Sequence, residues 1–135
     1  MRIGFVDSNV FLRFFTKGDE AQRDRARRLF RAAEAGTVSL ITGPPVLFEV
    51  VWVLARLYKL GKGETLDILD RILALPGLEL IDRKLVEEAI RLARSSGQDF
   101  PDAYIAASAR ESSTDGVATF NRAHFETLGS PIFDF

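Results

Sequence analysis

Short apolar runs rich in β-branched residues alternate along this chain with longer stretches of helical periodicity. We expect buried strands at residues 2–6, 38–41 and 78–81, a short fourth strand at 117–119 and a fifth, at the edge of the sheet, at 131–135. Between them, apolar residues recur at the i, i+3, i+4, i+7 spacing that is typical of amphipathic helices. The helices are expected at about 10–15, 20–35, 44–60, 63–74, 84–94 and 99–112, with one further turn near residue 124.

This alternation of strands and helices predicts a parallel sheet with right-handed crossovers. We therefore expect an α/β fold of three α/β/α layers, with a central parallel sheet of four to five short strands. The 135 residues suit one domain over 1–135, because two halves would each be too small to bury a convincing core.

Composition excludes several classes of protein. No cysteine is present, which excludes a disulfide scaffold, a thiol nucleophile and a Cys-ligated metal site. With 47% hydrophobic residues the chain is not disordered, and no apolar run approaches the ~18 residues of a membrane span. The residues after Met1 do not read as a signal peptide. We expect a cytoplasmic protein without a membrane partner.

Charge excludes binding of nucleic acid through a large overall positive charge. The chain has 18 Lys+Arg against 19 Asp+Glu, a net charge of −1. Five arginines nevertheless fall between residues 23 and 31, on one expected helix. They form a solvated helix face by default, and they could also attract phosphates locally.

Ionisable and polar residues follow or precede the strands at one end. Asp7 comes directly after the first strand, and Asn121 directly after the fourth. Asp99 and Asp102 open the helix that leads to the fourth strand. In an open α/β sheet the site lies beyond the carboxyl ends of the strands, so we expect these four residues to meet at one edge.

Glu49 stands apart, because it is the single carboxylate among nine apolar residues at 46–55. A helix that is apolar on every side is a buried one, so we expect Glu49 inside the protein or at an interface. An unpartnered ionised carboxylate there would cost several kcal/mol. Glu49 would then be protonated, paired with a cation or bound to a metal.

Each of these residues also has an ordinary structural interpretation. Asp7 could cap the helix that follows it. Asp99 and Asp102 could be the N-cap and third residue of one helix. Glu49 could pair with an arginine, and Asn121 could be a turn residue.

Oxygen-only ligands suit hard cations, Mg²⁺ or Mn²⁺, rather than zinc or copper. Such an ion can lower the pKa of a bound water and absorb charge at phosphorus. This is phosphodiester hydrolysis without a protein nucleophile. It suits a chain without Cys whose one His, His124, we expect to be a surface or capping residue. The basic helix at 20–35 could hold flanking phosphates.

Four motifs then occur in a recognisable order. They are a strand followed by Asp-Ser-Asn-Val at 3–10, Pro-x-Val-Leu-x-Glu-Val-Val-x-Val-Leu at 44–54, Asp-Phe-Pro-Asp-Ala-Tyr-Ile-Ala-Ala at 99–107 and Ala-Thr-Phe-Asn-Arg at 118–122. The chain resembles a PIN-domain ribonuclease and, within that family, a VapC-type toxin of a bacterial or archaeal toxin–antitoxin pair. The resemblance covers essentially the whole chain.

The resemblance implies a role for each residue of the site. Asp7, Glu49 and Asp102 match the three metal-binding acids of the family. Asn121 occupies the position where the family often has a fourth acid, which removes one negative charge. One Mg²⁺ or Mn²⁺ held by Asp7 and Asp102, with Glu49 nearby, is therefore implied, and Asp99 could supply part of the missing charge.

The resemblance also implies a supporting residue and partners. The hydroxyl of Thr119 would support the site residues without binding the metal itself. An RNA substrate, a homodimer and a small cognate antitoxin whose tail occupies the active-site groove are implied as well. The apolar helix around Trp52 and the 11 Phe residues offer surface for such contacts.

Three rival interpretations share features with this sequence. A haloacid-dehalogenase-type phosphatase needs an acid where this chain has Asn9, and a receiver-type phospho-acceptor domain finds only Asp82 in place. The third rival is a catalytically silent PIN-like module that binds RNA or a protein partner. Asn121, which replaces an acid, is the feature in its favour.

Overall fold

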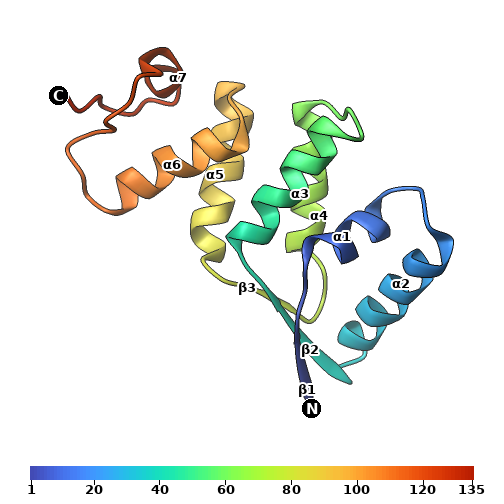
Figure 1. Cartoon of the computed structure of the whole chain (residues 1–135). Coiled ribbons are helices and arrows are strands. Elements are labelled where there is room, and N and C mark those ends of the chain that lie inside the picture. Colours follow the sequence, from blue (N-terminus) through green and yellow to red (C-terminus); the bar gives the residue numbers. More distant parts are fainter. The chain divides into compact units, whose positions relative to one another are not determined.

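Three parallel strands in the order β1-β2-β3 form the sheet of this chain. The structure, a computed structural model, describes all residues from 1 to 135 (Figure 1). They form two compact units, unit 1 at residues 1–82 and unit 2 at 83–135. The strands all belong to unit 1; they are β1 (Arg2–Phe5), β2 (Val38–Thr42) and β3 (Leu78–Leu80).

Four helices complete unit 1, with bounds close to those expected. They are α1 (Ser8–Phe15), α2 (Glu20–Glu34), α3 (Pro44–Arg56) and α4 (Lys62–Leu73). Asp19 caps α2 by accepting a hydrogen bond from the Gln22 N–H at 3.0 Å. Two prolines occupy the first turn of α3, where a missing N–H costs nothing.

The core of unit 1 lies between the sheet and these helices. Along β2, buried Val38, Leu40 and Thr42 alternate with partly exposed residues, as the period of a strand requires. Phe11 of α1 is fully buried and stacks on Phe30 of α2, with ring centroids 5.7 Å apart. Burial of each such side chain contributes about 1.5–3 kcal/mol, so α1 and α2 are strongly fixed to each other.

Gly77 lets α2 and the start of β3 approach closely. Its φ of +77° is a backbone conformation that favours glycine. An added Cβ would lie 2.5 Å from the carbonyl oxygen of Ala33, at the end of α2. Any other residue here would force the two elements apart.

Unit 2 is built on a helical pair. It contains α5 (Arg83–Ser96), α6 (Phe100–Glu111) and the short α7 (Arg122–Thr127). Small side chains allow α5 and α6 to pack closely, and the buried ones are Ala89, Ala93, Ala103, Ala106 and Ala107. Phe125 and Leu128 bury the apolar side of α7.

The α/β class is confirmed, but the number of strands is three rather than four or five. The expected strands at 117–119 and 131–135 are wrong, because these segments meet in a single parallel bridge between Val117 and Ile132. The Val117 N–H donates to Pro131 O, and its carbonyl accepts from the Phe133 N–H. The extended run ends there, since the Asn121 N–H donates a hydrogen bond back to the Thr119 hydroxyl at 2.9 Å.

None of the helices combines the length and the apolar character that are needed to cross a membrane.

Candidate active site

Asp7 is placed by the end of β1. Next to it, the Val6 N–H donates to Ile41 O at 2.8 Å, and the buried Thr42 hydroxyl donates to Val6 O at 3.0 Å. Asp7 is the N-cap residue of α1, and its Oδ1 accepts the Ser8 N–H at 2.8 Å. The side chain is exposed, and its Oδ2 is left for a ligand. The capping interpretation of Asp7 is thus confirmed without excluding a metal-binding one.

Glu49 lies in the second turn of α3, and the expectation that it lies inside the protein is wrong; the alternative, that it lies at an interface, stays a prediction. Only one side of α3 is buried, through Pro44, Leu47, Val50 and Leu54. Glu49 itself is exposed, and Trp52 is 56% exposed. Apolar composition predicted more burial than the packing supplies, because α1 and α4 cover only part of the helix. Glu49 forms no ion pair, so the pairing with an arginine is not observed.

Asp7 and Glu49 belong to the same edge of the sheet in unit 1. Strands β1 and β2 are parallel neighbours, so their carboxyl ends lie side by side. Helix α1 starts three residues after the end of β1, and α3 starts two residues after the end of β2. Helices α1 and α3 also pack together. Unit 1 therefore presents two exposed carboxylates at the carboxyl edge of its sheet.

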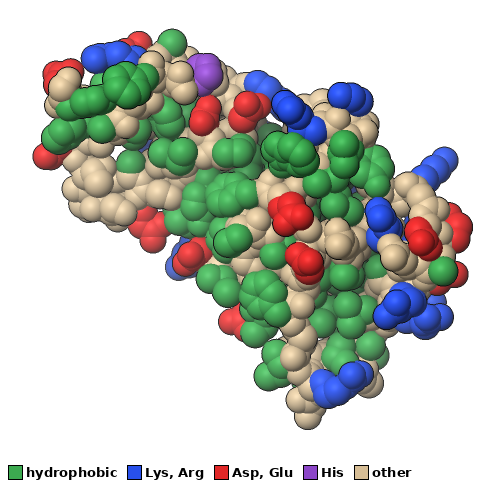
Figure 2. All heavy atoms as spheres, viewed as in Figure 1, with side chains coloured by type: hydrophobic (Ala, Val, Ile, Leu, Met, Phe, Trp, Pro, Cys, Tyr) green, Lys and Arg blue, Asp and Glu red, His purple; other side chains and the backbone are tan.

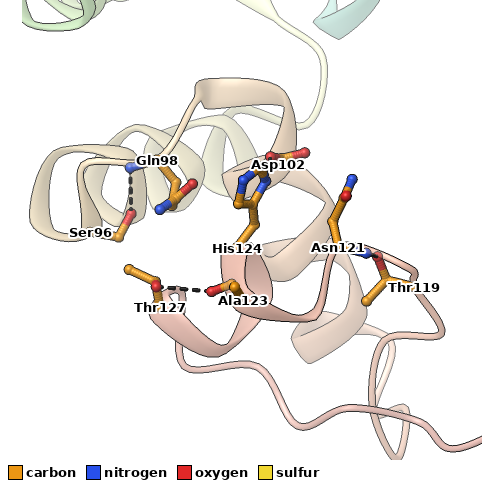
Figure 3. Close-up of polar contacts among 8 residues, drawn as sticks. All are labelled: Ser96, Gln98, Asp102, Thr119, Asn121, Ala123, His124 and Thr127. Carbon is orange, nitrogen blue, oxygen red and sulfur yellow. Dashed lines mark hydrogen bonds and ion pairs between the residues drawn. The ribbon is translucent and has the colours of Figure 1, made fainter.

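Two further acids stand at the start of α6 in unit 2. Asp99 is the N-cap residue, although its carboxylate makes no capping hydrogen bond, and Asp102 is the third residue of the helix. The expected N-cap and third-residue positions are thus confirmed. Asp102 Oδ2 lies 3.3 Å from Nδ1 of His124 on α7 (Figure 3). The Asp102 side chain is 26% exposed and that of His124 52%.

Asn121 immediately precedes α7 and is exposed. Its backbone N–H donates to the Thr119 hydroxyl, which fixes the turn in the Thr-Phe-Asn segment. Its side-chain amide makes no capping bond and extends on the side where Asp102 and His124 lie (Figure 3). Asn121 is therefore a turn residue, as the ordinary interpretation had it, and also a possible oxygen ligand.

His124 is the residue of this group that the sequence did not reveal. It lies 22 positions after Asp102, on a helix of only six residues, and no motif links the two. The one available signal was that a lone His follows the Thr-Phe-Asn segment by three residues. The hydrogen bond to Asp102 requires the proton on Nδ1, and the charge on Asp102 then favours that tautomer.

The candidate residues are thus divided between the units. Asp7 and Glu49 belong to unit 1, and Asp99, Asp102 and Asn121 to unit 2. Within neither unit do three or more His, Asp or Glu side chains gather in a way that could hold a metal ion. The expected meeting of all the acids therefore stays a prediction. The donors on each unit are mainly carboxylate oxygens, the chemistry that suits Mg²⁺ or Mn²⁺.

Comparison with known proteins decides the family. The family model of the PIN domain matches residues 4–129, a stretch that contains all four sequence motifs except residue 3 of the first. The chain belongs to the PIN-domain family. The family expected from the motifs is confirmed, and the phosphatase and receiver-domain rivals are excluded. The matched residues 4–129 include most of unit 1 and most of unit 2.

Among solved structures, this PIN domain is similar to VapC20 of Mycobacterium tuberculosis, a sarcin-ricin loop cleaving toxin. The two share 23% sequence identity over 95% of this chain and 96% of VapC20, with a TM-score of 0.42. No curated protein matches the chain.

Proposed function

We propose that this PIN domain is a metal-dependent endoribonuclease that hydrolyses RNA phosphodiester bonds, and that it is the toxin of a toxin–antitoxin pair. The observation that carries the proposal is the family match, which runs through the three acid-bearing motifs and through the fourth motif, where Asn121 stands. Because this match spans both units, we propose that residues 1–135 form one PIN domain. Asp7, exposed at the carboxyl edge of the sheet, occupies the position where α/β folds bind ligands.

In this proposal Asp7 and Asp102 bind one Mg²⁺ or Mn²⁺, with Glu49 beside them and Asp99 as a weaker contributor. When bound, the ion supplies an activated water and a counter-charge for the phosphate. Each acid has a carboxylate oxygen that suits this role. Asn121 adds a neutral oxygen instead of a fourth charge, so the proposal has one ion rather than two.

The protein's own groups have separate tasks. The hydrogen bond from the Ser8 N–H fixes one oxygen of Asp7 and so orients the other. His124 Nδ1 does the same for Asp102. Glu49, exposed and outside any ion pair, is available to accept a proton from the attacking water. The hydroxyl of Thr119 holds the turn from which Asn121 projects.

The partners follow from the same proposal. RNA is the substrate, a cognate antitoxin is the inhibitor, and the active form is a homodimer in the cytoplasm. Figure 2 shows hydrophobic side chains exposed at the surface. Trp52 on α3 and Leu57, directly after this helix, are exposed apolar residues that are available for protein contacts.

A second candidate function is a catalytically silent PIN module that binds RNA or a protein partner. The observation in its favour is Asn121, which leaves the site one charge short. Metal affinity separates the two functions, since a silent module has no need to bind Mn²⁺.

The test is cleavage of a labelled pool of structured RNA by the full chain, with Mg²⁺, with Mn²⁺ and with EDTA. Asp7→Asn is the site variant. Asp115→Asn, an exposed loop acid outside the motifs, is the matched control. We expect metal-dependent cuts that disappear in Asp7→Asn and persist in Asp115→Asn. Absence of cleavage together with absence of Mn²⁺ binding by calorimetry would instead identify the silent module.

A further inference from the structure

A pocket of about 480 Å³ lies between α1 and α2, within unit 1. Its walls come from two turns of α2 and just over one turn of α1, helices that run next to each other at the right of Figure 1. The volume falls within the ~300–1,000 Å³ that is typical of ligand sites. The catalytic proposal assigns no role to this pocket.

The polar lining of the pocket carries positive charge and no negative charge. Its polar residues are Asn9 and Arg13 on α1 and Gln22 and Arg25 on α2. Arg13 Nε donates to Gln22 Oε1 at 2.7 Å, which leaves the two terminal nitrogens of Arg13 as donors. Arg25 forms no ion pair, whereas Arg27 on the same helix pairs with Asp24 at 3.6 Å. Two guanidinium groups that no carboxylate neutralises give this pocket the chemistry that suits an anion.

The rest of the lining is aliphatic. Val10, Ala26 and Leu29 provide it. Leu29 belongs to the apolar stripe of α2, yet it is only partly buried, while Ala26 and Phe30 beside it are buried. The reason is that Leu29 faces the pocket rather than the core. An apolar wall next to two cations and two amides suits a ligand with a flat apolar face, polar edges and a phosphate.

From this lining we propose that the α1–α2 pocket binds one nucleotide of the RNA substrate, at a position that flanks the cleaved bond. Arg13 and Arg25 bind its phosphate, the amides of Asn9 and Gln22 contact the base edge, and the aliphatic wall contacts the base or ribose face. Asn9 lies two residues from Asp7, in the first turn of the helix that Asp7 caps. This inference rests on the proposed ribonuclease function and assigns a substrate subsite to it.

Binding is measured in the full chain carrying Asp7→Asn, so that RNA is held and not cut. The probe is a labelled pool of structured RNA, followed by fluorescence anisotropy over a series of salt concentrations. In this background Arg25→Gln removes one pocket charge. Arg28→Gln is the matched control, because Arg28 is exposed on the same helix, outside the pocket lining and without an ion pair.

We expect Arg25→Gln to weaken binding about tenfold, as for the loss of one charged hydrogen bond. The slope of log affinity against log salt should fall by about 0.7, the value for one phosphate contact on a single strand. Asn9→Ala should weaken binding and leave the slope unchanged, since it touches no phosphate. Arg28→Gln should change neither quantity.

Cleavage activity, measured in a chain that keeps Asp7, separates the subsite proposal from the catalytic proposal. With Asp7 restored, Arg25→Gln should raise KM and leave kcat near its original value, because the nucleotide is bound equally in the ground and transition states. Unchanged RNA affinity in Arg25→Gln, with cleavage by the unmodified chain intact, would overturn the subsite alone. The same would follow if Arg25→Gln and Arg28→Gln weakened binding equally, or if the pocket bound an acidic peptide and not RNA. An unmodified chain that neither binds nor cuts RNA would overturn both proposals.

Discussion

The carboxylates of unit 1 and those of unit 2 are held by different means. Asp7 follows β1, and the residue before it, Val6, is joined to the end of β2 by the Thr42 hydroxyl and by a backbone hydrogen bond. Asp102 stands on a helix, and a side chain from another helix, His124, is its hydrogen-bond partner. The first position is therefore set by the backbone of the sheet, and the second by a contact between two side chains.

This difference separates stability from function. A change to the support of Asp7 disturbs a buried part of the fold. A change to the support of Asp102 removes a contact between partly exposed side chains, which adds little to stability. Unit 2 is thus where substitution can weaken the site and leave the fold intact.

The largest expected effect on RNA cleavage is that of removing either acid, and it should be equal for the acid of unit 1 and the acid of unit 2. Asp7→Asn and Asp102→Asn should each lower RNA cleavage more than ~100-fold, beyond the range seen when only a supporting residue is lost. The measurement is the rate of cleavage with Mn²⁺. Circular dichroism should show an unchanged or slightly more stable fold, because repulsion between metal-free acids is relieved. If either variant cut RNA at the original rate, that acid would have no place in the site.

The support of Asp102 comes next. His124→Ala should weaken Mn²⁺ binding by about tenfold, since a carboxylate without its orienting partner is a poorer ligand. Stability should change by less than ~1 kcal/mol. Calorimetry with Mn²⁺ and thermal unfolding measure the two quantities. Arg122→Ala on the same helix removes an exposed pair with Asp134 and is the control. Equal effects of the two variants would remove the special role of His124.

A change to the residue that supports Asp7 should instead lower the stability of the fold. Thr42→Val keeps the side-chain shape and removes the hydroxyl that donates to Val6 O. Because the buried carbonyl then loses a partner, the free energy of unfolding should fall by about 1–2 kcal/mol. Urea denaturation measures it. Thr37→Val, which removes an exposed hydroxyl bonded to Ala32 O, should cost less and so serves as the comparison. A Thr42→Val chain as stable as the original would show that the sheet does not depend on this bond.

The smallest effect concerns Ser8, directly after Asp7. Its hydroxyl is buried and has no hydrogen-bond partner. Ser8→Ala should therefore leave the free energy of unfolding unchanged or raise it by about 1 kcal/mol, because an unsatisfied polar atom is removed. Chemical denaturation again provides the measurement. A loss of stability would indicate that the hydroxyl has a partner in solution, and the support of Asp7 would then include Ser8.

The sequence predicted the elements of unit 1 well, and its failures have physical causes. Periodicity located β1, β2 and β3, since each is a local apolar run bounded by turn residues. It also suggested a strand at 117–119, but this segment pairs with the chain around Ile132 in a single bridge, and a strand requires several consecutive pairs. Glu49 shows the same limit for burial, because an apolar helix is buried only on the sides that neighbours cover.

The candidate site divides in the same manner. The four motifs, their order and the position of Asp7 after a strand could be read from the sequence alone, and the PIN-domain family was indicated by the resemblance of these motifs to it. They depend on local chemistry: a strand, the turn that ends it and the cap of the next helix. The contact between Asp102 and His124 and the pocket between α1 and α2 join residues that are distant in sequence or lie on different helices. Only the tertiary structure decided these, because packing brings such side chains together and no local pattern records it.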